Sequence, residues 1–327
     1  MELEMSIRIG FIGVGGIAQD HIRVLMKMED TKIVSVFDLN ADNARRAAEA
    51  TGAEVMDSAD QVLDKQRIDL VFICTPQFAR GDLEVVAARR GIPFFVEKPL
   101  GVDAEVVRQK EQIIRETGII HAVGYVLRYY DTVQQAKQYL QGRRPHLIQG
   151  IRIGGSHPAK WWKQLDMSGG HLVDTATHQV DMIRYLAGEI REVQAAFGRV
   201  SFDQMEPEST IPDAGAINFL MDSGAVGSLT ETCLSPFYGG SDIKFFGPDF
   251  YVHLSQNGSH LTLIDNEQSL SVTAQSDPGY EQCRTLVDAV KSGNQSSILC
   301  DYADALQTLK VTLAANRSSA EQAGLSL

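Results

Sequence analysis

The chain has 327 residues, more than one hydrophobic core usually organises, so its length predicts two domains. Apolar residues make up 44% of the sequence and charged residues 22%, which is typical of a folded globular protein and excludes a disordered one. The net charge of −12 argues against a protein whose main partner is nucleic acid or an anionic lipid surface.

Compartment is indicated by hydropathy and by cysteine usage. No apolar run approaches the roughly 18 residues that span a bilayer, and the N-terminal residues carry no Lys or Arg, unlike a secretory signal. The cysteines are widely spaced and form no Cys-x-x-Cys motif, which fits neither a zinc site nor a disulfide scaffold. We therefore expect a cytoplasmic protein with no membrane partner.

The first part of the chain alternates strand and helix patterns. Strands are predicted at residues 7–12, 32–37, 69–73, 93–96 and 119–123. Helical patterns lie between them, at residues 18–26, 41–50, 81–90 and 103–117. Because strands separated by helices need crossover connections, this order predicts a doubly wound parallel sheet, an α/β domain over residues 1–124.

The second part is rich in β-branched and alternating runs. Strands are predicted at residues 146–153, 192–200, 214–221, 225–233, 241–246, 250–254 and 269–274. Two helical patterns close the chain, at residues 280–291 and 301–318. We expect an α+β domain over residues 125–327, with a large, open, mainly antiparallel sheet and helices on one side.

A glycine-rich turn follows the first predicted strand. Gly13, Gly15 and Ala18 form a G-x-G-x-x-A motif that includes Gly16 and Ile17 and opens the first helix. The first glycine permits the tight turn, the second leaves room for a pyrophosphate, and Ala18 allows close packing of helix on strand. The helix N-terminus offers unpaired N–H groups to the phosphates. The motif thus predicts a dinucleotide site of the Rossmann type.

An acidic residue ends the second predicted strand. Asp38 lies about twenty residues beyond the glycine motif, where a carboxylate can accept hydrogen bonds from the ribose hydroxyls. The same carboxylate would repel a 2′-phosphate, and no Arg or Lys stands at Leu39, Asn40 or Ala41 to offset it. We therefore predict NAD as the cofactor, with NADP less favoured.

Residues 172–187 are predicted as one helix with a polar stripe. At 100° per residue, Asp174, His178, Asp181 and Tyr185 share one side. Such a stripe predicts the wall of a cleft, although an ordinary amphipathic helix is the alternative. A histidine can titrate near neutrality, so His178 suits proton exchange with an alcohol, while Asp174 can orient the imidazole and stabilise its charged form.

A lysine follows the strand predicted at residues 93–96. Ligands gather at the carboxyl ends of parallel strands, and Pro99 restricts the backbone of Lys98 to an extended shape. An ammonium at this position can bond a reacting oxygen and stabilise negative charge as it develops.

Further segments carry a family resemblance. They are Cys74-Thr75-Pro76, Glu97-Lys98-Pro99 and the run from Gly169 to Asp181 with its Asp-x-x-x-His pattern. Together with the glycine turn they resemble the Gfo/Idh/MocA family of nicotinamide-dependent oxidoreductases, which includes glucose-fructose oxidoreductase and inositol dehydrogenases. The likeness covers essentially the whole chain.

The resemblance implies that Lys98 is catalytic and that Asp174 and His178 act on the substrate hydroxyl. The predicted cofactor-binding residues are Gly13, Gly15, Gly16, Ile17, Asp38, Leu39, Cys74, Thr75, Gln77, Glu97 and Lys98. The sequence departs from the family pattern at two positions, with Arg80 where the family often has His and Ala176 where it often has Gly. The first departure concerns a cofactor-side contact.

The function predicted on these grounds is hydride transfer between a nicotinamide and a secondary alcohol or ketone of a sugar, cyclitol or related polyol. His178 would act as general acid/base, supported by Lys98 and Asp174. Tyr125, Arg128 and Trp162 are the candidates for the substrate wall, since an indole can cover the apolar face of a sugar ring.

Alternative functions stay open at this stage. The spacing of His171, Asp174, His178 and Asp181 also suits a metal-dependent hydrolase, which would leave the nicotinamide fingerprint unexplained; we predict no metal. An NAD-dependent glycosidase of the same family is a second alternative, and a non-catalytic NAD-binding sensor is a third.

The open face of the second sheet is a predicted subunit contact. The strand at 214–221 is apolar on both sides, which indicates cover beyond the domain's own helices. We expect a homodimer or homotetramer.

Overall fold

A computed structural model describes residues 6–327, which divide into two compact units. The first unit comprises the described residues up to Gly101, Glu105–Val126 and Pro278–Leu306. The second comprises Val102–Ala104, Leu127–Asp277 and Gln307–Leu327. The sequence predicts a single boundary between residues 124 and 125, whereas in the structure Pro278–Leu306 groups with the first unit.

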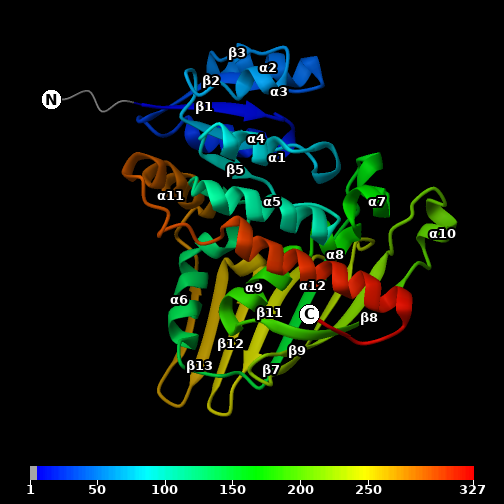
Figure 1. The fold of residues 1–327 in the computed structure, drawn as a ribbon. Coiled ribbons are helices and arrows are strands. Elements are labelled where there is room, and N and C mark those ends of the chain that lie inside the picture. The colour runs from blue at the N-terminus through cyan, green and yellow to red at the C-terminus, as the bar shows by residue number, and fades with distance from the viewer. Residues whose placement is uncertain (1–5) are drawn as a thin grey trace. The chain divides into compact units, whose positions relative to one another are not determined.

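The first unit contains a parallel sheet with the strand order β3-β2-β1-β4-β5-β6 (Figure 1). Its strands are β1 (Ile7–Ile12), β2 (Thr31–Phe37), β3 (Glu54–Val55), β4 (Leu70–Ile73), β5 (Phe94–Val96) and β6 (His121–Val123). The connecting helices are α1 (Gly16–Leu25), α2 (Ala41–Thr51), α3 (Ala59–Val62), α4 (Leu83–Arg89) and α5 (Ala104–Thr117). The order reverses between β1 and β4, so the predicted doubly wound Rossmann sheet is confirmed.

Alternate residues of β1 point to opposite faces of this sheet. Ile9 and Phe11 are fully buried in the core that contains the apolar side of α1. Gly10 faces the other way, and a Cβ there would lie 2.7 Å from Cγ1 of Val62 on α3. Helices therefore cover both faces, as a parallel sheet buried on both sides requires.

Helix α11 (Pro278–Ser292) belongs to the first unit because of its apolar face. Leu286 and Val287 are fully buried in the same core as Ile22 and Leu25 of α1. The helical period of this segment was readable in the sequence. Its packing partner was not, because an apolar stripe does not specify which surface will cover it.

The second unit contains a mixed sheet with the order β14-β13-β12-β11-β7-β10-β9-β8-β15. β7 and β10 are parallel, and the other neighbouring pairs are antiparallel, which confirms the predicted mainly antiparallel sheet. The strands are β7 (Leu147–Ile153), β8 (Ile190–Gly198), β9 (Ala214–Met221), β10 (Val226–Thr232), β11 (Gly240–Phe246), β12 (Phe250–Ser255), β13 (His260–Asp265), β14 (Ser269–Thr273) and β15 (Leu325–Ser326).

Helices α6 and α9 pack on one face of this sheet (Figure 1). α9 contacts β7 and β11, while α6 contacts β12, β13 and α9. Of these two helices, α6 spans Asp131–Leu140 and α9 spans Thr177–Ala187. The other α-helices of this part of the chain are α7 (Leu165–Ser168), α8 (Gly170–Asp174), α10 (Phe202–Met205) and α12 (Tyr302–Glu321). Within the described residues, no helix combines the length and the apolar content that crossing a bilayer needs.

The structure corrects the prediction of one helix over residues 172–187. Thr175, with φ −110° and ψ −55°, separates α8 from α9, so Asp174 and His178 lie on different helices. The sequence analysis also missed β13 and α6. Leu261 and Leu263 alternate as buried residues in β13, a signal that was present but was not used.

A buried ion pair fixes α9 to the short turn Val126–Tyr129. Arg128 donates from Nε to Oδ2 of Asp181 at 2.8 Å and from Nη2 to Oδ1 at 2.6 Å. Both side chains are almost completely buried, and Thr308 Oγ1 also donates to Asp181, at 3.1 Å. The guanidinium fork therefore satisfies a carboxylate that water does not reach.

Replacing Arg128 by Met should destabilise the fold by about 3–5 kcal/mol, because Asp181 would become an uncompensated buried charge. Arg317→Ala, which breaks the exposed pair with Glu321, is the control and should cost less than about 1 kcal/mol. Urea unfolding followed by circular dichroism measures both variants. Equal urea midpoints for Arg128→Met and Arg317→Ala would show that the buried ion pair contributes no more to stability than the exposed one.

Candidate functional site

The glycine turn joins β1 to α1. Gly13 has φ +81°, and a Cβ there would lie 2.9 Å from the carbonyl carbon of Cys74 and from the nitrogen of Thr75, so only glycine fits. An added Cβ at Gly15 or Gly16 meets no described atom within 4 Å. The space in front of the N-terminus of α1 is thus open to a phosphate group.

Asp38 holds this turn in place. Its Oδ2 accepts the N–H of Val14 at 2.8 Å, and its Oδ1 accepts the N–H of Asn40 at 2.8 Å. Each carboxylate oxygen can accept a further hydrogen bond, so these contacts orient Asp38 without exhausting its capacity to bind ribose hydroxyls. The adjacent Leu39 is 90% exposed and Ile17 is 49% exposed.

The segment after β4 contributes a buried hydroxyl. Thr75 Oγ1 is buried and has no hydrogen-bond partner among residues 6–327, which is unusual for a polar atom removed from water. Burial, together with the charge of Glu97, raises the pKa of the Cys74 thiol well above its usual value, so Cys74 acts as a small apolar group. Gln77 follows in the turn Gln77–Ala79 and is largely buried.

These features fit a bound dinucleotide. The open glycine cradle can take a pyrophosphate, the oriented carboxylate of Asp38 can take a ribose, and the unsatisfied hydroxyl of Thr75 can bond to a ligand that passes the end of β4. Exposed apolar surface at Ile17 and Leu39 beside the cradle can cover an aromatic base.

Glu97 links the segment after β5 to α1. Its Oε1 bonds to Nε2 of His21 at 2.8 Å, and its Oε2 accepts the backbone N–H of Lys98 at 3.1 Å. The Sγ of Cys283 lies 3.5 Å from Nδ1 of His21. Burial acts to lower the pKa of His21, but the contacts with Cys283 and Glu97 outweigh it and raise this pKa to about 10. His21 therefore orients Glu97 through a direct contact inside the protein.

In the second unit, Asp174 and His178 flank the break between α8 and α9. Oδ2 of Asp174 accepts the indole N–H of Trp162 at 2.8 Å and the hydroxyl of Thr175 at 3.2 Å. His178 stands in the first turn of α9 and, like Asp174, is half-buried. The carboxylate is thus oriented by neighbours, and the imidazole is partly exposed, with its Nδ1 buried.

The residues whose spacing also suited a metal have separate partners. Nδ1 of His171 contacts Oε2 of Glu231, Asp174 accepts from Trp162, and Asp181 pairs with Arg128. Among the described residues, no group of three or more His, Cys, Asp and Glu side chains is placed to hold a metal ion.

The predicted substrate residues are buried. Tyr125 and Trp162 are each 1% exposed and Arg128 is 2% exposed. Trp162 packs among Phe202 and Ile211, with its N–H directed at Asp174. Arg128 faces Asp181.

The sequence analysis missed His21 and Glu231 as partners of motif residues. Both lie on regular elements, α1 and β10, and each is buried while carrying an ionisable group. An ionisable side chain at a position where the pattern requires an apolar one was the available signal.

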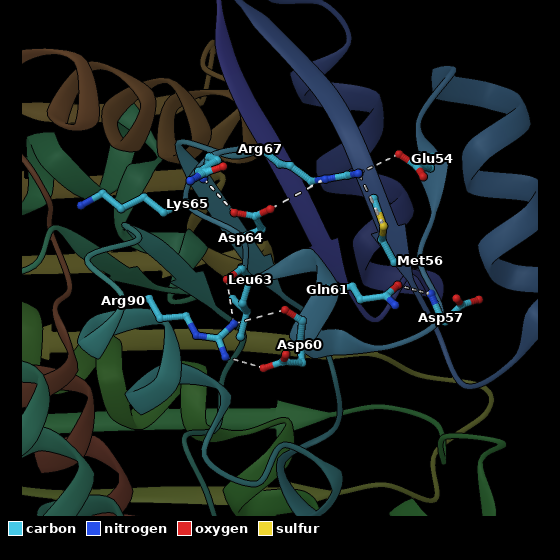
Figure 2. Close-up of a pocket in the computed structure, with 11 residues that line it drawn as sticks. Glu54, Met56, Asp57, Asp60, Gln61, Leu63, Asp64, Lys65, Arg67 and Arg90 are labelled. Carbon is cyan, nitrogen blue, oxygen red and sulfur yellow. Dashed lines mark hydrogen bonds and ion pairs between the residues drawn. The ribbon is translucent and has the colours of Figure 1, made fainter.

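A separate pocket of about 890 Å³ lies at the opposite edge of the parallel sheet (Figure 2). Most of its residues precede β4 and β5, on the side of the amino ends of these strands, whereas Met56 and Asp57 follow β3. Figure 2 shows that its arginines are engaged: Arg67 pairs with Glu54 and Asp64, and Arg90 with Asp60. Because ligands of such sheets bind at the carboxyl ends, the position of most of these residues argues against this pocket as the dinucleotide site.

Two family models match the chain. Residues 7–125 match a model described as an oxidoreductase family with an NAD-binding Rossmann fold. Residues 137–254 match a model described as the GFO/IDH/MocA C-terminal domain.

Characterised relatives align over nearly their full length. The scyllo-inositol 2-dehydrogenase (NAD(+)) of Bacillus subtilis is 29% identical, covering 97% of this chain and 95% of the relative. The myo-inositol 2-dehydrogenase of Thermotoga maritima is 24% identical, covering 98% of each. A solved structure of levoglucosan dehydrogenase in complex with NADH has a TM-score of 0.88 at 21% identity, covering 98% of this chain and 99% of that one, which shows a shared fold.

Replacing Gly13 by Ala should weaken NADH binding by roughly tenfold or more, because the methyl group would collide with backbone atoms and force the turn to move. Gly52→Ala is the matched control: φ there is +73°, but an added Cβ meets no described atom within 4 Å. Calorimetric titration with NADH measures both variants. Equal losses of affinity would assign the effect to backbone strain and not to the cradle.

Proposed function

Because the chain belongs to the Gfo/Idh/MocA family of NAD-dependent oxidoreductases, we propose that Lys98, Asp174 and His178 transfer a hydride and a proton between NAD and a polyol. The cofactor is NAD, and the reaction interconverts a secondary alcohol and a ketone. The observation that carries the residue assignment is the hydrogen bond from the Lys98 backbone to Glu97, which fixes the start of the lysine side chain at the carboxyl end of β5.

When bound, NAD supplies the acceptor or donor of the hydride. The turn from Gly13 to Gly16 and the N-terminus of α1 hold its pyrophosphate. Asp38 bonds its ribose, and the same carboxylate disfavours the 2′-phosphate of NADP. Ile17, Leu39, Cys74, Thr75, Gln77, Glu97 and Lys98 complete the proposed cofactor contacts.

Lys98 stabilises charge on the reacting oxygen. As a carbinol loses hydride and proton, negative charge develops on its oxygen in the transition state, and an ammonium that donates to this oxygen lowers the barrier. Glu97 supports the role by fixing the backbone of Lys98, since His21 holds the glutamate on its other side.

His178 takes the hydroxyl proton during oxidation and returns it during reduction. An imidazole suits this exchange because both of its protonation states are accessible near neutral pH. Asp174 has an oriented carboxylate that can bond a substrate hydroxyl and stabilise the imidazolium as it forms.

The proposed substrate class is a cyclitol or sugar. It is supported by the names of the relatives, which act on scyllo-inositol and myo-inositol, and by the levoglucosan dehydrogenase fold. Tyr125, Arg128 and Trp162 stay predictions as substrate contacts, and their burial favours shaping the wall over direct bonding.

An NAD-dependent glycosidase would use similar residues but would return the hydride before releasing product. The two activities differ in their net redox balance. Accumulation of NADH with a free cyclitol supports the dehydrogenase, whereas glycoside cleavage without NADH accumulation would favour the glycosidase.

We also propose a cytoplasmic homodimer or homotetramer. The face of the large sheet opposite α6 and α9 carries the half-buried side chains of Ile151, Leu220 and Phe246, a surface that a second copy can cover. The compartment is inferred from the cysteines, which are buried and form no disulfide within the described residues.

Replacing Lys98 or His178 by Ala should lower turnover by about 10²-fold or more, since each change removes a group that acts on the reacting oxygen. NADH affinity should change little, because the pyrophosphate contacts stay intact. NADH formation from inositols, levoglucosan and related polyols measures turnover, and NADH fluorescence titration measures binding.

Lys65→Ala is the control for loss of a lysine, because Lys65 is exposed and lies in the pocket at the opposite sheet edge. It should retain full turnover. Unchanged turnover in Lys98→Ala or His178→Ala would remove that residue from the mechanism.

Replacing Trp162 by Phe removes the N–H that bonds Asp174 but keeps an aromatic ring among Phe202 and Ile211. Turnover should fall roughly tenfold, because a hydrogen bond to a charged group is lost. Trp161→Phe, one residue away, is the matched control, and its turnover should stay close to that of the parent protein. Equal turnover in both variants would argue against orientation of Asp174 by Trp162.

A further inference from the structure

Arg80 occupies one of the two positions where the sequence departs from the family pattern, and its environment gives it a distinct role. The residue follows the turn Gln77–Ala79 and is 2% exposed. The terminal N–H groups of this buried guanidinium find their partners within the protein, whereas Nε has none among the described residues, so the partners of Nη1 and Nη2 indicate what Arg80 holds together.

The partners of Arg80 are backbone carbonyls from two segments of the proposed cofactor site. Nη2 donates to the carbonyl of Thr75 at 2.9 Å. Nη1 donates to the carbonyl of Pro99 at 2.9 Å and is 3.4 Å from that of Leu100. One rigid fork therefore connects the segment that follows β4 with the segment that follows β5.

The segment that follows β5 carries Lys98. Glu97 fixes the backbone of Lys98 on one side, through its contact with His21. Arg80 fixes the other side, through Pro99 and Leu100. The backbone from which the proposed catalytic amine extends is thus held from both directions by buried charged groups.

We propose that Arg80 is a positioning residue that sets Lys98 relative to the Thr75 segment and hence to the bound cofactor. This inference rests on the proposed function of Lys98. A planar guanidinium suits the role because its N–H groups have fixed directions, whereas a lysine ammonium is a point donor on a flexible stem. Small displacements of a reacting group cost large factors in rate.

A buried ion network lies next to the guanidinium without bonding either carbonyl segment. Oε1 of Glu84, a fully buried residue, lies 3.9 Å from Nη1 of Arg80, and its Oε2 lies 3.3 Å from Nζ of Lys110. Tyr302 also donates to Glu84, at 3.5 Å. A carboxylate cannot donate to a carbonyl oxygen, so Glu84 holds neither segment directly, and a Glu84 variant disturbs the network while it leaves the fork in place.

The first test compares Arg80→Lys with Glu84→Gln in turnover, NADH affinity and thermal midpoint. Arg80→Lys should lower turnover by roughly tenfold or more while NADH affinity changes by less than about threefold, because the glycine turn still binds the pyrophosphate. Glu84→Gln should lower the midpoint of thermal unfolding, while its turnover should stay close to that of the parent protein. In Arg80→Ala, added guanidinium chloride at low concentration should restore part of the turnover.

The second test needs no substrate. Acetylation of lysines by acetic anhydride, followed by mass spectrometry, reports the exposure and reactivity of the Lys98 amine, with Lys65 as an internal reference. Arg80→Lys should shift the rate at Lys98 relative to Lys65, and Glu84→Gln should leave this ratio unchanged.

Parent-like turnover and labelling in Arg80→Lys would overturn the proposal. Equal effects in Arg80→Lys and Glu84→Gln would overturn it as well, since they would assign the change to the buried network. An active Lys98→Ala variant would instead overturn the proposed function. An inactive Lys98→Ala beside a fully active Arg80→Lys would leave that function intact and reject only the role of Arg80.

Discussion

The parallel pairing of β1, β2, β4 and β5 is the constraint on which the proposed cofactor site depends. Neighbouring parallel strands end at the same edge, so the residues that follow each strand are brought together. Gly13 follows β1, Asp38 follows β2, Thr75 follows β4 and Lys98 follows β5. Backbone bonds from Gly13 to Phe37 and from Cys74 to Ile12 continue the pairing beyond the strands and carry the order of the sheet into the turns.

The sheet brings these residues to one edge, and side-chain contacts then fix their positions more closely. Asp38 holds the glycine turn through the N–H of Val14, and Glu97 and Arg80 hold the two sides of the Lys98 segment. In the second unit, Trp162 does the same for Asp174. Where such a donor or acceptor is buried, it keeps one geometry because any other would leave it unsatisfied.

Much of the first unit was predictable from the sequence, because its strands and helices have strong periodicity and its turns carry glycine and proline at the expected places. The motif with Gly13, Gly15 and Ala18 predicted a turn that the structure has. The break at Thr175 was not predicted, since Thr and Ala are compatible with a continuous helix and only tertiary packing decides between one helix and two. The bonds of Trp162 to Asp174 and of His21 to Glu97 were beyond reach for the same reason: each joins residues whose proximity exists only in the folded chain.

The most direct test of the account follows a labelled hydrogen atom. A cyclitol deuterated at its ring carbons is incubated with the protein and NAD, and the NADH formed is analysed by mass spectrometry. If the chain transfers hydride from a carbinol carbon to the nicotinamide, the NADH will carry the deuterium. NADH that contains only solvent-derived hydrogen, or glycoside turnover with no NADH formed, would contradict the central claim.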